Sequence, residues 1–367
     1  MEERQLAEKL IGYDTSNQDG VRLCAGFVKG WLEAREIPTS TLELRGLPIL
    51  LAEVGPPGPG VPAVALHGHI DVVPAREGQF EPRVDGDRLI GRGAYDMKGA
   101  ISAIMLALAD LRDQRDVRVC LAIVPDEESE EEDYRGTDMY VDSGLDVSFA
   151  ITGEPTDMHV GVAAKGVLAV RLEVQGRAAH GSTPWEGDNA ILKAFSIFRS
   201  IESLPFTCES SELFDRPSIN LGRILGGDAF NKVPDSCVID VDIRYLPEQQ
   251  IDEIVAQIED LPDSRVLSTF TRPPVEVDPD SGFVRALCAA AAPHHEGEVT
   301  SVGRDGASDA ISFIRVGVPA VEFGPTGGGH HGPDEWVSIS SLAGYRKALR
   351  DFVSRVPAEL PERGSRA

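Results

Sequence analysis

Three short apolar runs, each followed closely by acidic side chains or a histidine, constrain the fold of this chain more than any other feature. Runs of this length and composition predict buried β-strands, which are expected at 61–66, 117–124 and 146–152. Helical patterns alternate with these runs and are expected at 2–12, 20–36 and 98–111. Helices that alternate with apolar strands predict an α/β fold, here a doubly wound domain with a mixed sheet.

The middle of the chain has a different pattern. Strands that bury one face are expected at 167–174, 218–225, 237–244 and 265–271, and helices at 189–201 and 249–261. This β-α-β-β-α-β order predicts a smaller α+β domain inserted into the larger one. A chain of 367 residues is comfortable for two domains. We therefore predict a discontinuous larger domain at 1–166 and 275–367 and an inserted domain at 167–274.

The composition excludes several classes of protein. With 60 acidic residues against 35 basic ones, the net charge is −25, and such a surface repels nucleic acid and anionic lipid. No apolar run approaches the roughly 18 residues that span a bilayer, and the N-terminus lacks a secretory signal, so the expected compartment is the cytoplasm. The five cysteines are scattered and never form a C-x-x-C pair, which argues against a disulfide framework and against a thiolate zinc site.

Five separated clusters of acids and histidines form the candidate site. They are His69-Ile70-Asp71, Asp96, Asp126-Glu127-Glu128, Glu154 and His331. Three of the clusters follow predicted strands, and open α/β sheets bind ligands at the carboxyl ends of their strands. The set supplies two imidazoles, three carboxylate ligands and one spare carboxylate, enough to hold two divalent metal ions beside a base. Because such a site activates water, the set predicts a hydrolase.

Each cluster taken alone also has a simpler explanation. An H-x-D sequence is common, Asp96 could be the N-cap of the following helix, and the acidic run after Glu128 could be a solvated loop. The glycines before His331 could form a flexible turn. His180 lies in a loop of the inserted segment and matters only if that domain folds over the site. The ordered combination of clusters therefore carries the prediction.

Seven short segments follow one another over nearly the whole chain. They are His69-Ile-Asp-Val-Val-Pro74, Gly91-Arg-Gly-Ala-Tyr-Asp-Met-Lys-Gly99, Asp126-Glu-Glu128, Gly153-Glu-Pro-Thr156, Gly176-Arg-Ala-Ala-His-Gly-Ser-Thr-Pro184, Asn231-Lys-Val-Pro234 and His331-Gly-Pro-Asp-Glu335. In this order they resemble the M20 metallopeptidase and deacylase family. That family includes acetylornithine deacetylases, succinyl-diaminopimelate desuccinylases, aminoacylases and glutamate carboxypeptidases.

The resemblance implies two zinc ions in each subunit. His69, Asp96 and Glu154 would hold one ion. His331, Asp96 and Glu128 would hold the other, so that Asp96 bridges the pair. Oxygen and imidazole ligands also accept cobalt or manganese.

The resemblance also implies roles for residues outside the ligand set. Glu127 would be the general base, and Asp71 would orient His69. The inserted domain at 167–274 would mediate a homodimer in which His180 reaches the neighbour's active site and stabilises the oxyanion. Asn231 and Arg244 would bind a carboxylate of the substrate.

The implied reaction is hydrolysis of the amide bond of an N-acyl amino acid, such as an acetyl or succinyl derivative, by a metal-bridged hydroxide. A dipeptidase or carboxypeptidase acting on short peptides is the alternative, and a non-catalytic metal-binding relative is a third hypothesis. The resemblance further implies a cis peptide bond at Asp96-Met97. The chain departs from the family at 129–135, where the loop is longer and more acidic, and at Gly181, where serine is commoner.

Overall fold

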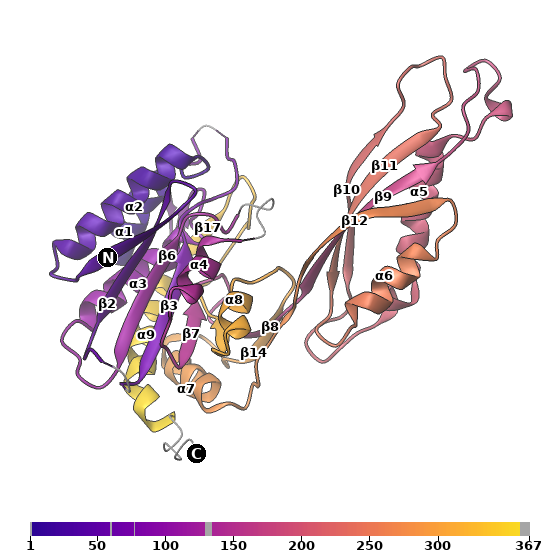
Figure 1. Ribbon diagram of the computed structural model, residues 1–367. Coiled ribbons are helices and arrows are strands. Elements are labelled where there is room, and N and C mark those ends of the chain that lie inside the picture. Colours follow the sequence, from indigo (N-terminus) through magenta and orange to yellow (C-terminus); the bar gives the residue numbers. More distant parts are fainter. Residues whose placement is uncertain (1, 59–60, 77, 129–133, 360–367) are drawn as a thin grey trace. The chain divides into compact units, whose positions relative to one another are not determined.

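The computed structural model describes residues 2–58, 61–76, 78–128 and 134–359, which form two compact units (Figure 1). Unit 1 comprises Met1–Val162, Val277–Val302 and Asp309–Ala367. Unit 2 comprises Ala163–Glu276 and Gly303–Ser308. The borders predicted from the sequence are 166/167 and 274/275, and unit 2 contains in addition the short segment Gly303–Ser308.

Unit 1 is built on a mixed β-sheet. The strands lie in the order β1-β2-β6-β3-β7-β15-β8. Their bounds are Thr39–Leu44 for β1, Leu47–Val54 for β2, Arg118–Val124 for β6, Ala63–His69 for β3, Phe149–Thr152 for β7, Ala320–Glu322 for β15 and Val160–Ala164 for β8. The neighbours β6, β3, β7 and β15 are parallel, whereas β2 and β8 run antiparallel to the strands beside them. The doubly wound mixed sheet predicted from the sequence is thereby confirmed.

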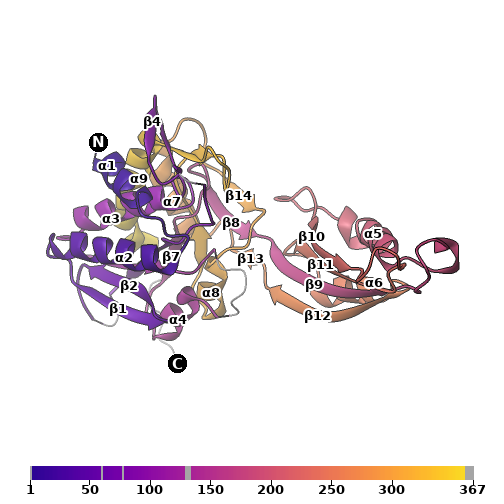
Figure 2. The ribbon, with the colours of Figure 1, turned by 90° about the horizontal axis from the view of Figure 1, so that it is seen from above.

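Helices cover both faces of this sheet, as Figures 1 and 2 show. One face carries α2 (Gln18–Glu33), α3 (Lys98–Asp110), α7 (Gly282–Ala291) and α9 (Ile339–Glu359), with α1 (Glu2–Ile11) packed on α3 and α9. The other face carries α4 (Gly136–Asp142) and α8 (Ala310–Arg315). Every side chain of α3 from Lys98 to Leu108 is buried, which explains why its sequence is small and apolar all round.

Unit 2 is a four-stranded antiparallel sheet covered by two helices. Its strands lie in the order β10-β11-β9-β12, with bounds Ser218–Gly226, Ser236–Tyr245, Gly166–Gln175 and Ser264–Arg272. The helices are α5 (Ala190–Ile201) and α6 (Ile251–Glu259). Along the chain the main elements follow the predicted β-α-β-β-α-β order. Alternate residues of β9 and β11 are buried against the two helices. The alternating sequence pattern therefore reflects a sheet with one covered face.

A small antiparallel sheet in unit 1 connects two distant parts of the sequence. It has the order β16-β17-β5-β4, with bounds Gly327–Gly328, Trp336–Ser338, Arg88–Ile90 and Arg83–Asp85. The hairpin β16–β17 encloses the turn with His331, and β5 leads into the loop with Asp96. None of the helices in the described part of the chain combines the length and the hydropathy of a membrane span.

Candidate metal and catalytic site

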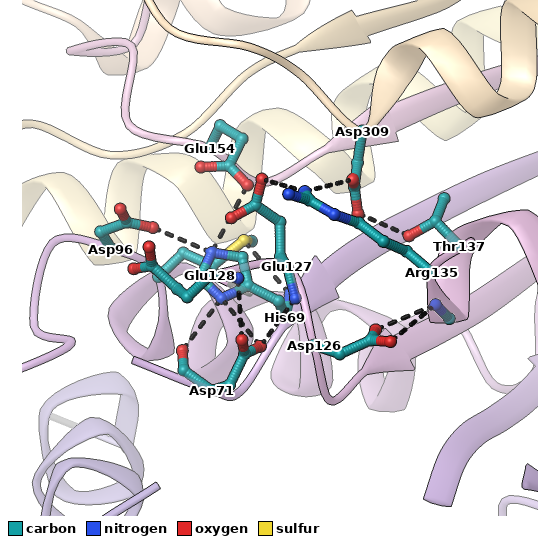
Figure 3. A network of polar contacts seen from close by, with 12 residues as sticks. His69, Asp71, Asp96, Asp126, Glu127, Glu128, Arg135, Thr137, Glu154 and Asp309 are labelled. Carbon is teal, nitrogen blue, oxygen red and sulfur yellow. Dashed lines mark hydrogen bonds and ion pairs between the residues drawn. The ribbon is translucent and has the colours of Figure 1, made fainter. Parts of the chain in front are cut away.

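The parallel strands β6, β3 and β7 bring three of the predicted clusters to one edge of the sheet. His69 is the last residue of β3 and lies opposite Val124, the last residue of β6. Glu127 and Glu128 follow β6, and Glu154 follows β7, the other neighbour of β3. The side chains from these three strand ends therefore meet, as Figure 3 shows.

Asp96 lies at the centre of the group, and its two carboxylate oxygens face different histidines. Oδ1 is 2.9 Å from Nε2 of His69, whereas Oδ2 is 3.4 Å from Nε2 of His331. Oδ2 also contacts Nε2 of His330 at 2.5 Å. The N-cap position of α3 is occupied by Met97, so Asp96 does not cap that helix. The peptide bond between Asp96 and Met97 is cis, as the sequence analysis predicted.

Two further carboxylates complete the group. Oε1 of Glu154 is 3.6 Å from Nε2 of His69. Oε1 of Glu128 is 3.1 Å from Nε2 of His331. Two sets therefore form around the two oxygens of Asp96, and each set contains at least one imidazole and one further carboxylate.

His330 is a candidate ligand that the sequence analysis did not include. Its ring and that of His331 both approach Oδ2 of Asp96, and these three residues form one of the groups whose atoms could share a metal ion. The other group within the described residues is His69, Asp96 and Glu154. The histidine doublet was visible in the sequence, but the family motif begins at His331 and so pointed to the second residue alone.

Asp71 fixes both the histidine before it and the two glutamates that follow β6. Nδ1 of His69 donates to the backbone carbonyl of Asp71 at 3.0 Å, while the Asp71 carboxylate is 3.5 Å away. This contact directs Nε2 of His69 toward the carboxylates. The Asp71 carboxylate accepts hydrogen bonds from the backbone N–H groups of Glu127 and Glu128, at 3.2 and 2.8 Å.

A buried ion pair holds the other side of the site. Arg92 and Glu335 are 2.5 Å apart, and their side chains are only 4% and 1% exposed. Oε1 of Glu335 accepts from the backbone N–H groups of Tyr95 and Asp96, and Arg92 donates to the carbonyl of His331 at 2.9 Å. The pair therefore ties the loop of Asp96 to the turn of His331. Glu335 is the last residue of the motif that begins at His331, but no local sequence pattern links Glu335 with Arg92.

The described residues concentrate negative charge at this edge of the sheet. Burial, together with the charge of Asp309, raises the pKa of Glu127 to about 8. Burial and the charge of Asp96 raise the pKa of Glu154 well above its ordinary value. Burial opposes ionisation of Asp96 too, but hydrogen bonds from three histidines hold the pKa of Asp96 well below its ordinary value. An excess of buried carboxylates is the environment in which a divalent cation is stabilising, so the donor set fits metal ions.

The histidines respond in the opposite direction. Burial lowers the pKa of His69, but hydrogen bonds to Asp71 and Asp96 outweigh it and raise this pKa well above the ordinary value. Hydrogen bonds to Asp96 and Glu128 raise the pKa of His331 to about 10. The carboxylates thus favour a positive charge on both rings. A metal ion would supply positive charge to the same carboxylates.

The three remaining predicted site residues belong to unit 2. His180 and Asn231 are neighbours, since the N–H of Gly181 donates to the carbonyl of Asn231 at 2.7 Å. Arg244 pairs with Val167 at the other end of β11, and its Nε donates to Asp242 at 3.1 Å. The eight residue-to-residue steps from Ser236 to Arg244 span about 27 Å at 3.4 Å per step. Within one copy of unit 2, Arg244 is therefore far from the other two.

The acidic loop that departs from the family lies mostly outside the described residues, at 129–133. Of the predicted loop, Tyr134 and Arg135 are described. The carboxylate of Asp126 accepts from Arg45 at 2.8 Å and from the N–H of Gly136 at 2.9 Å. Burial raises the pKa of Asp126 to about 6. Asp126 thus anchors the end of this loop instead of facing the histidines.

Comparison with known families identifies the family of this chain. The model of peptidase family M20/M25/M40 matches residues 65–355. The chain belongs to this family. As an M20 protein it is a hydrolytic enzyme. The matched segment includes His69, Asp96, Glu154 and His331.

Individual relatives are named for related but different activities. This M20 enzyme is 31% identical to a succinyl-diaminopimelate desuccinylase from Sphingopyxis alaskensis, over 82% of this chain and 83% of the relative. It is 32% identical to a probable carboxypeptidase from Aspergillus terreus, over 78% of this chain and 70% of the relative. The crystal structure of an M20 metallo-carboxypeptidase from Sulfolobus solfataricus has the same fold, with a TM-score of 0.78, 18% identity and coverage of 98% and 100%.

Replacing Glu335 by glutamine is expected to destabilise unit 1 by about 3–5 kcal/mol, because the buried Arg92 guanidinium loses its counter-charge. Asp334→Asn is the matched control. Asp334 pairs with Arg83 at 2.9 Å on the surface, with side chains 78% and 66% exposed, and the loss there is expected to stay below about 1 kcal/mol. Urea unfolding of both variants measures the difference, and equal small losses would contradict the role of the buried pair.

Proposed function

We propose that this M20 enzyme hydrolyses the amide bond of an N-acyl amino acid with the help of two divalent metal ions in each subunit. Zinc is the first candidate, with cobalt or manganese as alternatives. The observation that carries the proposal is the carboxylate of Asp96, whose Oδ1 faces His69 at 2.9 Å and whose Oδ2 faces His331 at 3.4 Å. A carboxylate with an imidazole at each oxygen is suited to bridge two cations.

The ligand sets follow from these contacts. His69, Asp96 and Glu154 would hold one ion, and His331, Asp96 and Glu128 would hold the other. His330 also approaches Asp96 and could assist the second set. When bound, the metal pair supplies Lewis-acid chemistry, since it acidifies water and polarises the amide carbonyl.

Glu127 is proposed as the general base. It follows β6 beside the ligand Glu128, and its backbone is fixed by Asp71 at 3.2 Å. Its carboxylate takes a proton from the attacking water and delivers it to the leaving nitrogen. In this proposal Asp71 holds Glu127, Glu128 and His69 in one mutual arrangement.

Two relatives support different substrates. The desuccinylase from Sphingopyxis alaskensis acts, by its name, on a succinylated amino acid, which favours N-acyl amino acids for this chain. The probable carboxypeptidase from Aspergillus terreus supports the second candidate, a peptidase that removes residues from short peptides. Arg244 and Asn231 are proposed to bind a substrate carboxylate, which both substrate classes possess. A cytoplasmic location belongs to the same proposal.

A homodimer formed through unit 2 is part of the proposal. In one copy Arg244 lies at the far end of β11 from His180, so the two groups would have to come from different copies to act on one substrate. Unit 2 also exposes apolar side chains on α5, where Leu192 and Phe195 are 65% and 49% exposed. The strand β10 lies at the edge of its sheet. These features suit a second copy of the chain.

Glu127→Gln is expected to lower kcat by about 10²–10⁴-fold while two metal ions remain bound, because it removes the proton acceptor and leaves the ligands. Glu128→Gln is the matched comparison from the next position, and it is expected to lose metal as well as activity. Elemental analysis of dialysed protein and initial rates measure both effects. Glu127→Gln with normal turnover would eliminate Glu127 as the base.

The substrate class is tested with one panel of compounds. N-acetyl and N-succinyl amino acids are expected to give higher kcat/KM than free-amine dipeptides and acylated dipeptides, and a chelator is expected to abolish every rate until zinc or cobalt is restored. A preference for dipeptides would favour the peptidase instead. Chelator-resistant hydrolysis would contradict both metal-dependent alternatives.

Sharing of the active site between subunits is tested by mixing two inactive variants. After subunit exchange between His180→Ala and Glu127→Gln, roughly a quarter of wild-type activity is expected, because half of the reassembled dimers carry one complete site. The control is each variant exchanged with itself. An inactive mixture whose subunits have demonstrably exchanged would show that His180 does not act across the dimer.

A further inference from the structure

Glu127 makes an ion pair on the side away from the metal-ligand group. Nη1 of Arg135 is 3.1 Å from Oε1 of Glu127. Figure 3 shows Glu127 between the cluster around His69 and the side chain of Arg135. The Arg135 side chain is only 9% exposed, so this contact is largely shielded from water and from screening ions.

Arg135 is shared with a second buried carboxylate. Nη1 of Arg135 is 3.6 Å from Oδ1 of Asp309, whose side chain is 1% exposed. Burial opposes ionisation of Asp309, but its interactions with His67 and Arg135 outweigh burial and lower its pKa below the ordinary value. Arg135 is therefore shared between two carboxylates, and its contact with Asp309 holds the guanidinium in place beside Glu127.

Asp309 is itself held by the sheet and a helix. Its Oδ2 accepts from the hydroxyl of Thr137 at 2.5 Å, and that hydroxyl is 2.9 Å from Nε2 of His67. His67 belongs to β3, Thr137 to the first turn of α4, and Asp309 precedes α8. All three residues are buried. A chain of contacts thus links the rigid sheet, through Asp309 and Arg135, to the carboxylate of Glu127.

We propose that Arg135 is a positioning residue for the proposed base, held in turn by Asp309. The ion pair occupies Oε1 of Glu127 and fixes the carboxylate, so that Oε2 handles the proton of the attacking water. Asp71 fixes the backbone of Glu127, and Arg135 fixes its side-chain end. Because Glu127 is held at its backbone and at its carboxylate, the carboxylate cannot rotate onto the cations as an extra ligand. This inference rests on the proposed function of Glu127 as base.

The test replaces Arg135 by alanine and measures kcat, KM and metal content together. The expected result is a fall in kcat of about 10–100-fold with KM and two bound metal ions unchanged, because the side chain of Glu127 loses its orientation. Added guanidinium ion is expected to restore part of kcat in Arg135→Ala and to leave the wild-type rate unaltered. A merely structural role would not give a rescue by the missing functional group.

Arg315→Ala is the matched control. Arg315 pairs with Asp142 at 2.8 Å and with Asp138 at 3.5 Å, and so bridges the same two helices, α4 and α8. It is half exposed and contacts neither Glu127 nor Asp309 by any ion pair among the described residues. Its removal is expected to leave kcat and the guanidinium response at wild-type values.

Should Arg135→Ala fail to fold, Arg135→Lys and Arg135→Gln carry the same test, since both keep a long polar side chain. A kcat at least tenfold higher for the lysine variant supports the positioning role. Equal kcat for the two, an unchanged kcat in Arg135→Ala, or a fall without guanidinium rescue overturns it. If Glu127→Gln remains active, the base assignment has failed; if only Arg135→Ala remains active, the positioning inference alone has failed.

Discussion

The structure of the site depends on how mutual repulsion between buried carboxylates is balanced. Asp71, Asp96, Glu127, Glu128 and Glu154 all lie at one edge of the sheet. Such a group is stable only if each charge has a specific partner. The fold supplies backbone N–H groups for Asp71, imidazoles for Asp96 and Glu128, and a guanidinium for Glu127. The charge that is left over is what makes the site suited to divalent cations.

Much of this edge could be predicted from the sequence because strand ends are marked locally. His69, Glu128 and Glu154 each follow a short apolar run, and the parallel neighbours β6, β3 and β7 bring those ends together. Asp96 and His331 follow no such run and were assigned by motif. Their proximity depends on the pairing of Trp336 with Ile90 in the small sheet, which no local pattern reports.

The residues that were not predicted from the sequence are those whose partners no local pattern indicates. Arg92 pairs with Glu335, and Arg135 pairs with Glu127 and Asp309. An ion pair of this kind leaves no periodicity, so only the folded chain reveals it. Elements were missed for a related reason. The strand β1 is partly exposed on both faces, and α4 spans only Gly136–Asp142, so neither has a strong apolar pattern. By contrast, the alternating strands of unit 2 were found in the correct order.

Glu127 and Glu128 share one backbone anchor but have different side-chain partners. Both N–H groups bind the same carboxylate of Asp71, so the backbone at these two positions is fixed as a unit. The side chains then diverge, since Glu127 meets Arg135 at 3.1 Å and Glu128 meets His331 at 3.1 Å. A cation would compete with His331 for Glu128 but would have to break an ion pair to recruit Glu127. We therefore attribute the proposed division between ligand and base to the two partners and not to the glutamates, which are chemically identical.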